Sequence, residues 1–95
     1  MPTFEEFQSL MRELYFSKDT FNGVEKTFLK LSEEIGELAE AILEESVDNI
    51  REEIADVIAW TVSIANLFGI DIDKAIYEKY PNVCPKCNYK PCKCK

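Results

Sequence analysis

Residues 54–68 read IADVIAWTVSIANLF, and this stretch decides the fold. On a helix, at about 100° per residue, the stretch presents two apolar sides. The first side carries Ile50, Val57, Trp60, Ile64 and Leu67, and the opposite side carries Ile58, Val62 and Ala65. A helix that is apolar nearly all round must be buried on both sides. Because four short helices cannot easily enclose it within one chain, we expect a homodimer or homotetramer to complete the core as a helical bundle.

Two helices are expected before this stretch, because apolar residues recur there at intervals of three and four. Thr3 and Glu6 have the capping-box spacing, and the pattern behind them predicts a helix over about 3–16. A polar segment, 17–22, separates it from a second helix over about 23–44. We expect the second and third helices to join the shared bundle of the oligomer.

Capping residues mark the remaining boundaries. Ser46 can cap the third helix, which is expected to end near Gly69. Asp71 can cap a short fourth helix that ends near Lys79. No alternating strand pattern of useful length occurs in the sequence. The predicted fold class is therefore all-α, with four short helices.

The length and charge of the chain limit its organisation and partners. With 95 residues, we expect one all-α domain over 1–80 and a cysteine-rich knuckle over 81–95. The net charge is -7, with all 18 acidic residues and 7 of the 11 bases in 1–83 and four lysines in 84–95. The strongly acidic segment 1–83 argues against nucleic acid as a partner, because phosphate backbones are bound by Lys and Arg. An anionic substrate would need a divalent cation to neutralise the carboxylates.

We recognise neither a membrane-spanning segment nor a signal peptide in the sequence, so we expect a cytoplasmic protein. The longest apolar stretch, Val57–Ile70, is too short to span a bilayer, so no membrane partner is expected. The start of the chain is acidic, whereas a signal peptide begins with basic residues. The sequence contains no histidine, which excludes histidine-based catalysis and histidine–metal sites.

Carboxylate pairs occur at i, i+3 on two of the predicted helices. Glu34 and Glu37 form one pair, and Glu53 and Asp56 form the other. This spacing places two side chains one turn apart, roughly 5 to 6 Å between Cβ atoms, so pairs on antiparallel helices can converge. Convergent carboxylates without nearby bases suit Mg²⁺, which prefers oxygen ligands and leaves positions open to substrate phosphates.

Glu53 is the residue that most favours a metal site, because it falls in the middle of the apolar stripe of the third helix. A buried carboxylate costs several kcal/mol, or becomes protonated, unless it is paired or bound to a metal. Two simpler interpretations remain. The acidic residues of the second helix could be an ordinary solvated face, and Lys30 or Arg51 could neutralise Glu53 and Asp56 across the helices.

The carboxylate motifs also resemble those of a known family. The segments EEIGEL at 33–38, EEIADV at 52–57 and GIDIDKA at 69–75 resemble the MazG-like, all-α nucleotide pyrophosphohydrolases over about 20–80. The resemblance implies hydrolysis of a nucleoside triphosphate to the monophosphate and pyrophosphate by a dimer or tetramer. It also implies Mg²⁺, with more than one ion favoured by four carboxylates, and a role in clearing non-standard nucleotides.

The resemblance assigns roles by position. Glu34, Glu37, Glu53 and Asp56 would be the Mg²⁺ ligands, and Glu33 an outer carboxylate that orients or deprotonates the attacking water. The phosphate-binding residues are less well defined, because many members have a basic, amide-bearing run after the fourth helix.

This chain has only KYPN at 79–82 in that place. We consider Lys30, Lys74 and Lys79 as candidates to bind the triphosphate, although each is also an ordinary surface lysine. Phe21, Tyr15 and Trp60 could stack on a base, but core packing is the simpler interpretation.

The last twelve residues contain all four cysteines. Cys84, Cys87, Cys92 and Cys94 form a CxxC and a CxC pair, which can enclose a structural tetrahedral Zn²⁺. Two disulfides or an iron–sulfur cluster are alternatives, but a reducing cytosol disfavours the former and the compact spacing favours a single ion. The knuckle could order the C-terminus, cover substrate phosphates or dock on a partner, and we favour the first role.

Two functions of different classes follow from these patterns. The first is an Mg²⁺-dependent nucleotide pyrophosphohydrolase, with phosphoribosyl-ATP pyrophosphohydrolase as a related activity. The second is a non-catalytic helical dimer whose knuckle binds a partner. Lysine partners on the carboxylates would favour the second.

Overall fold

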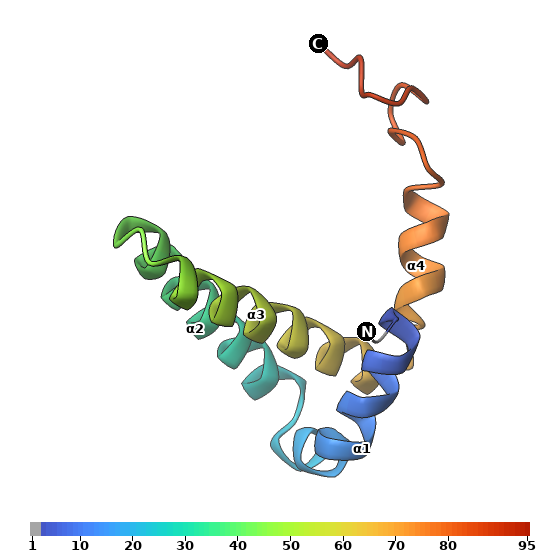
Figure 1. Cartoon of the computed structure of the whole chain (residues 1–95). Coiled ribbons are helices and arrows are strands. Elements are labelled where there is room, and N and C mark those ends of the chain that lie inside the picture. Colours follow the sequence, from blue (N-terminus) through green and yellow to red (C-terminus); the bar gives the residue numbers. More distant parts are fainter. Residues whose placement is uncertain (1–2) are drawn as a thin grey trace.

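The chain forms four helices, which confirms the all-α prediction (Figure 1). We describe residues 3–95 of a computed structural model. The helices are α1 (Phe4–Asn22), α2 (Val24–Leu43), α3 (Val47–Leu67) and α4 (Ile72–Lys79). Within 3–95 there is no strand.

The predicted caps are present at three helix starts. Thr3 and Glu6 form the reciprocal capping box of α1. The Ser46 hydroxyl accepts a hydrogen bond from the Asn49 amide at the start of α3, at 3.4 Å. The Asp71 carboxylate accepts one from the Lys74 amide at the start of α4, at 3.1 Å. Side-chain acceptors at these positions satisfy amides that have no partner within the helix.

The first helix is longer than predicted. The segment 17–22, which we expected to be a linker, forms the last turns of α1. Apart from Phe21 its residues are polar, but no proline or glycine interrupts them, and the helix ends only at Gly23. Gly23 has φ 90°, a conformation that favours glycine, and its amide donates to the Asp19 carbonyl at 2.8 Å. Because of this extension, only Gly23 separates α1 from α2.

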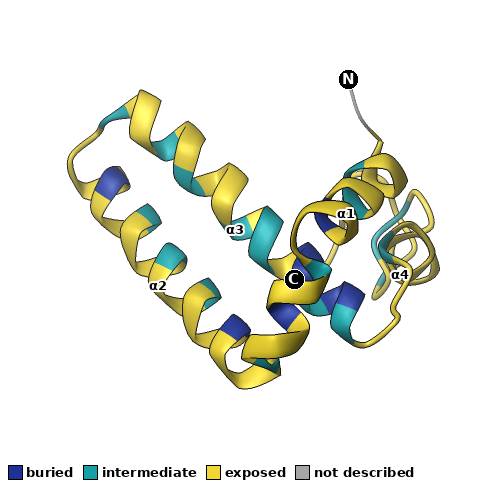
Figure 2. Ribbon diagram, turned by 90° about the horizontal axis from the view of Figure 1, so that it is seen from below, coloured by how far each residue is buried: buried dark blue, intermediate teal, exposed yellow. Residues whose placement is uncertain are grey.

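An antiparallel hairpin of α2 and α3 is the largest helix pair, and α1 crosses the C-terminal half of α3 (Figure 1). The buried apolar residues lie on α1, α2 and α3, and they are Met11, Ala41, Val62 and Ala65. Figure 2 shows buried positions gathered where α1 meets α3, while most of the hairpin surface is exposed. Of the two apolar sides of α3, the first is half-buried, and the second is buried only at Val62 and Ala65.

The fourth helix projects from the end of α3 away from the hairpin, and the C-terminal segment extends beyond it (Figure 1). The radius of gyration is 15.5 Å, whereas about 12 Å is expected for a compact domain of this length. Within 3–95 no single helix is long and apolar enough to cross a membrane. Only α3 and α4 together, bent by 102° at their junction, reach that length and composition.

Gln8 fixes the start of α4 on α1. Its side-chain amide donates to the Ile70 carbonyl at 2.6 Å and accepts from the Ile72 amide at 3.1 Å. The Gln8 carbonyl also accepts from the Asn66 side chain at 3.2 Å. These bonds set the direction in which α4 leaves the body.

We predict that Gln8→Ala loosens this junction. Loss of two hydrogen bonds should lower the free energy of unfolding by about 1 to 2 kcal/mol and speed hydrogen exchange at the Ile72 amide. Ser9→Ala, a neighbouring exposed change on the same helix, is the control. Unchanged exchange at Ile72 in the Gln8 variant would show that other contacts hold α4.

Candidate active site

Three carboxylates converge between the two helices of the hairpin. Glu34 and Glu37 lie one turn apart on α2, and Glu53 lies on the facing α3. One carboxylate oxygen from each residue lies within 4.8 Å of the others. The antiparallel hairpin therefore brings together acidic residues from two separate sequence motifs, as their spacing predicted. We call these three residues the carboxylate cluster.

Two oxygens of the cluster are buried and have no hydrogen-bond partner. They are one Oε2 atom in each of Glu34 and Glu53. Buried carboxylate oxygens are costly unless they are protonated or paired with a cation. Glu53 is half-buried within the apolar stripe, where the sequence placed it. The cluster thus contains buried acceptor atoms that no described donor satisfies.

No lysine or arginine neutralises the cluster among the described residues. Lys30, one of the predicted neutralising partners, lies 3.3 Å from the exposed carboxylate of Glu33 instead. The other ion pair within the described residues joins Lys74 to Glu78 at 4.0 Å on α4. Neither pair includes Glu53 or Asp56, so the simpler interpretation of these acids as bridged to bases is not supported.

The crowding changes the proton affinity of the cluster. Burial raises the pKa of Glu34 from 4.5 to about 7, and the nearby Glu53, Glu37 and Asp56 carboxyls add to the rise. In Glu53 the Glu34 carboxyl acts to lower the pKa, but burial and the charges of Glu37 and Asp56 outweigh it and raise the pKa. Glu34 and Glu53 therefore titrate together, and a proton shared between them relieves the repulsion.

Asp56 lies beside the cluster rather than within it. It is exposed, and with Glu34 it lines a cavity of about 300 Å³ between α1 and α3. Its charge still contributes to the raised pKa values of Glu34 and Glu53. Asp56 thus connects the cluster to the cavity.

The remaining wall of the cavity comes from one face of α1, with Met11, Tyr15, Lys18, Asp19 and Asn22, and from Ala59, Trp60 and Ser63 of α3. Sequence reasoning missed Lys18, Asp19 and Asn22, because it ended the first helix at 16. Their helical spacing from Met11 and Tyr15 was the available signal. Asp19 is only 5% exposed. Phe21, in contrast, is 90% exposed and does not line the cavity.

Comparison with known proteins identifies the family of the chain. The MazG nucleotide pyrophosphohydrolase domain matches residues 22–88, which is more than half of the chain. The chain belongs to the MazG family. Membership implies nucleotide pyrophosphohydrolase activity, and with it a nucleotide substrate. No curated protein matches the chain.

The MazG match divides the site into two parts. The carboxylate cluster and Asp56 lie inside the match, whereas Tyr15, Lys18 and Asp19 precede it. The acidic residues therefore lie within the matched segment, whereas most of the α1 wall of the cavity lies outside it.

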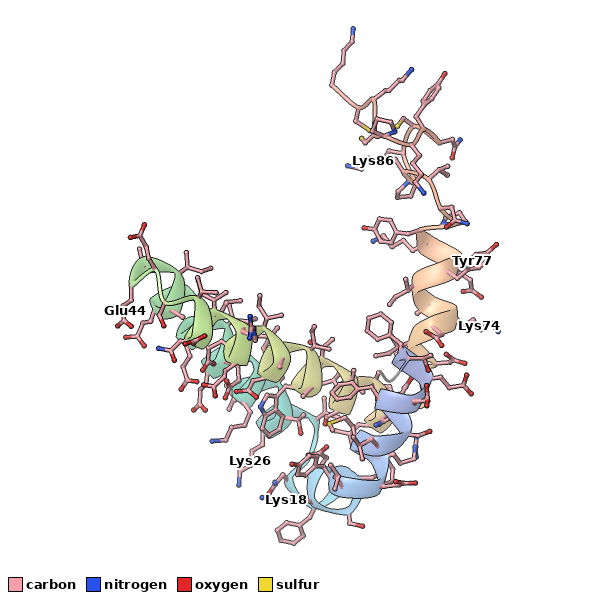
Figure 3. The ribbon with its side chains drawn as sticks, in the orientation of Figure 1. Lys18, Lys26, Glu44, Lys74, Tyr77 and Lys86 are labelled. Carbon is pink, nitrogen blue, oxygen red and sulfur yellow. The ribbon has the colours of Figure 1, made fainter. Side chains whose placement is uncertain are left out.

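The three predicted phosphate-binding lysines lie apart from one another. Lys30 is on α2 and pairs with Glu33. Lys74 and Lys79 are on α4, and the Lys79 ammonium lies 5.8 Å from the centre of the Tyr80 ring. Figure 3 shows Lys74 on the projecting helix, away from the hairpin, and Lys18 near the junction of α1 and α2. Among the described residues of this MazG protein, the lysine that lines the cavity beside Glu34 is Lys18.

We predict that the metal-free protein becomes less stable as the pH rises from about 4.5 to about 7. The pKa of Glu34 is raised to about 7, so over this range the folded state keeps a proton that the unfolded state has lost. Mg²⁺ should raise the melting temperature at pH 8 and have little effect at pH 5, because protonated carboxyls bind cations poorly. Thermal unfolding with and without Mg²⁺ measures both effects.

Glu34→Gln should flatten this pH dependence and remove the Mg²⁺ effect. Glu52→Gln is the matched control, since Glu52 adjoins Glu53 in sequence but lies outside the cluster. An equal response in both variants would show that the stability change arises elsewhere on the acidic surface.

Proposed function

We propose that this MazG protein hydrolyses nucleoside triphosphates to the monophosphate and pyrophosphate, using Mg²⁺ held by Glu34, Glu37, Glu53 and Asp56. The supporting observation is the pair of buried, unpartnered oxygens of Glu34 and Glu53. Oxygen donors converging within 4.8 Å are the ligand type that Mg²⁺ prefers. With Asp56 alongside, the donors are numerous enough for more than one ion.

In the proposed mechanism, different residues would hold the metal ion and activate the attacking water. When bound, Mg²⁺ would neutralise the triphosphate and stabilise the charge that develops on the leaving pyrophosphate. The cluster would hold the ion most strongly above about pH 7, where Glu34 is ionised and can act as a ligand. Glu33, exposed beside Glu34 and paired with Lys30, is the outer carboxylate that orients or deprotonates the attacking water.

The cavity between α1 and α3 is proposed to receive the nucleoside. Its volume of about 300 Å³ and its Tyr15 and Trp60 rings suit a base, and it opens beside Glu34 and Asp56. Lys18 is placed to meet the anionic substrate, with Lys30, Lys74 and Lys79 as the other candidates for phosphate contacts. The buried Asp19 carboxylate is an acceptor, so it would favour bases that carry an exocyclic amino group.

We predict that Glu53→Gln abolishes pyrophosphate release while the helical content is retained. Loss of one ligand should reduce turnover on the order of 100-fold or more. The assay incubates ribo- and deoxynucleoside triphosphates and phosphoribosyl-ATP with the protein, with and without Mg²⁺, and identifies the products. Glu52→Gln, the control, should keep its activity.

The same assay can reject the proposal. Diphosphate and phosphate as products, or full turnover by Glu53→Gln, would contradict it. No turnover of any nucleotide by folded wild-type protein would favour the non-catalytic helical dimer. Equal rates for all bases would remove only the proposed role of Asp19.

A second copy of the chain is proposed to cover the apolar surfaces that one chain leaves open. An apolar groove of about 420 Å³ runs along α3 and α4, and its lining includes Ile58, Ile64, Ile72 and Ile76. Ile58 is 39% exposed and Ile54, one turn earlier, 45% exposed. Contiguous apolar surface of this kind typically marks an interface.

We predict that Ile58→Glu dissociates the oligomer, because it places a charge in the groove. Sedimentation at micromolar concentration should show a dimer or tetramer for the wild type and a smaller species for the variant. Ser17→Glu, an exposed change on α1, is the control and should leave the mass unchanged. A wild-type monomer would contradict the proposal.

A further inference from the structure

The C-terminal segment lacks a hydrophobic core. No residue from Phe68 to Lys95 is buried, and α4 makes its main contact with α1 alone. Beyond Lys79 the chain leaves the body and turns back on itself (Figure 1). Two backbone hydrogen bonds form the turn: the Cys84 amide donates to the Tyr89 carbonyl at 3.1 Å, and the Asn88 amide to the Cys84 carbonyl at 2.8 Å. So small a segment needs a metal or a covalent crosslink to stay folded.

The turn brings the four thiols together. One sulfur from each of Cys84, Cys87, Cys92 and Cys94 lies within 4.8 Å of all the others. The Sγ atoms of Cys84 and Cys94 are 3.7 Å apart. A tetrahedron with Zn–S bonds of about 2.3 Å has edges of about 3.8 Å, whereas a disulfide needs about 2.05 Å. The spacing therefore matches shared ligation of one ion, and all four cysteines are free.

Backbone amides point at the sulfurs. The Lys93 amide donates to Cys87 Sγ and the Cys94 amide to Cys92 Sγ, each at 3.3 Å. Such donors stabilise the thiolate, which is the form that binds metal. The surrounding backbone is thus arranged for negatively charged sulfur.

Charge balance accounts for the lysines of the segment. Four thiolates around one divalent ion leave a charge of about −2. Residues 84–95 contain four lysines and no acidic residue. Lysines interleaved with the cysteines offset that charge locally, so they need not bind substrate phosphates to have a role.

We propose that Cys84, Cys87, Cys92 and Cys94 bind one Zn²⁺ in a closed tetrathiolate site that folds the C-terminal segment. The site is chemically separate from the carboxylate cluster. Sulfur ligands select zinc over magnesium, and the carboxylates favour the opposite choice. All four positions of the tetrahedron come from the protein, which leaves no open position for a substrate and makes the site structural.

The test is the metal content of protein purified under reducing conditions with zinc and dialysed into Mg²⁺ buffer. Wild type should retain about one Zn²⁺ per chain and Cys92→Ser/Cys94→Ser less than about 0.1. Glu53→Gln, which alters the other centre, should retain as much zinc as wild type. Replacement by Co²⁺ should give the visible spectrum of a tetrahedral thiolate site.

A chelator experiment on the wild type covers the case in which the double variant does not fold. Removing zinc should abolish hydrogen-exchange protection at the Asn88 amide, while the helical content of α1–α3 is unchanged. Four reduced thiols without metal, loss of all free thiols to disulfides, or bound iron would each overturn the proposal. So would zinc that is lost in Glu53→Gln.

Discussion

Repulsion between carboxylates held against each other in the α2–α3 hairpin is the constraint on which the rest of the site depends. Burial and neighbouring charges raise the pKa of Glu34 to about 7, and they raise that of Glu53 as well. A proton or a cation that offsets this charge stabilises the packing of the hairpin. In the proposed metal site, the same interaction that weakens the metal-free fold would favour the binding of a divalent ion.

A second constraint is the shortage of buried apolar surface. Within 3–95 four apolar residues are buried, which is few for a domain of this size, and the open shape leaves large side chains exposed on α2, α3 and α4. The hairpin presents its acidic residues on a surface that α1 covers only in part, and the resulting gap is the cavity beside Glu34 and Asp56. Incomplete packing within one chain thus leaves room for both a ligand and a second copy.

The two candidate metal centres differ in the way each is built. The carboxylate cluster takes its ligands from two long helices, so its geometry depends on how α2 packs against α3. The cysteine knuckle takes its ligands from eleven consecutive residues, and local turns suffice to bring them together. Hard oxygen ligands suit a metal that must remain open to phosphates, whereas a closed set of soft sulfur ligands suits a structural ion.

The sequence by itself determined the features that depend on neighbouring residues: helix caps, the i, i+3 spacing of Glu34 and Glu37, and the cysteine spacing. It also predicted the convergence of Glu53 with that pair. It missed the last turns of α1, because polar residues without a helix breaker resemble a linker. Only the tertiary structure decided that Lys18 and Asp19 line the cavity and that Asp56 lies beside the cluster. Periodicity fixes the face of a helix on which a residue lies, but the crossing of α1 over α3 decides what that face meets.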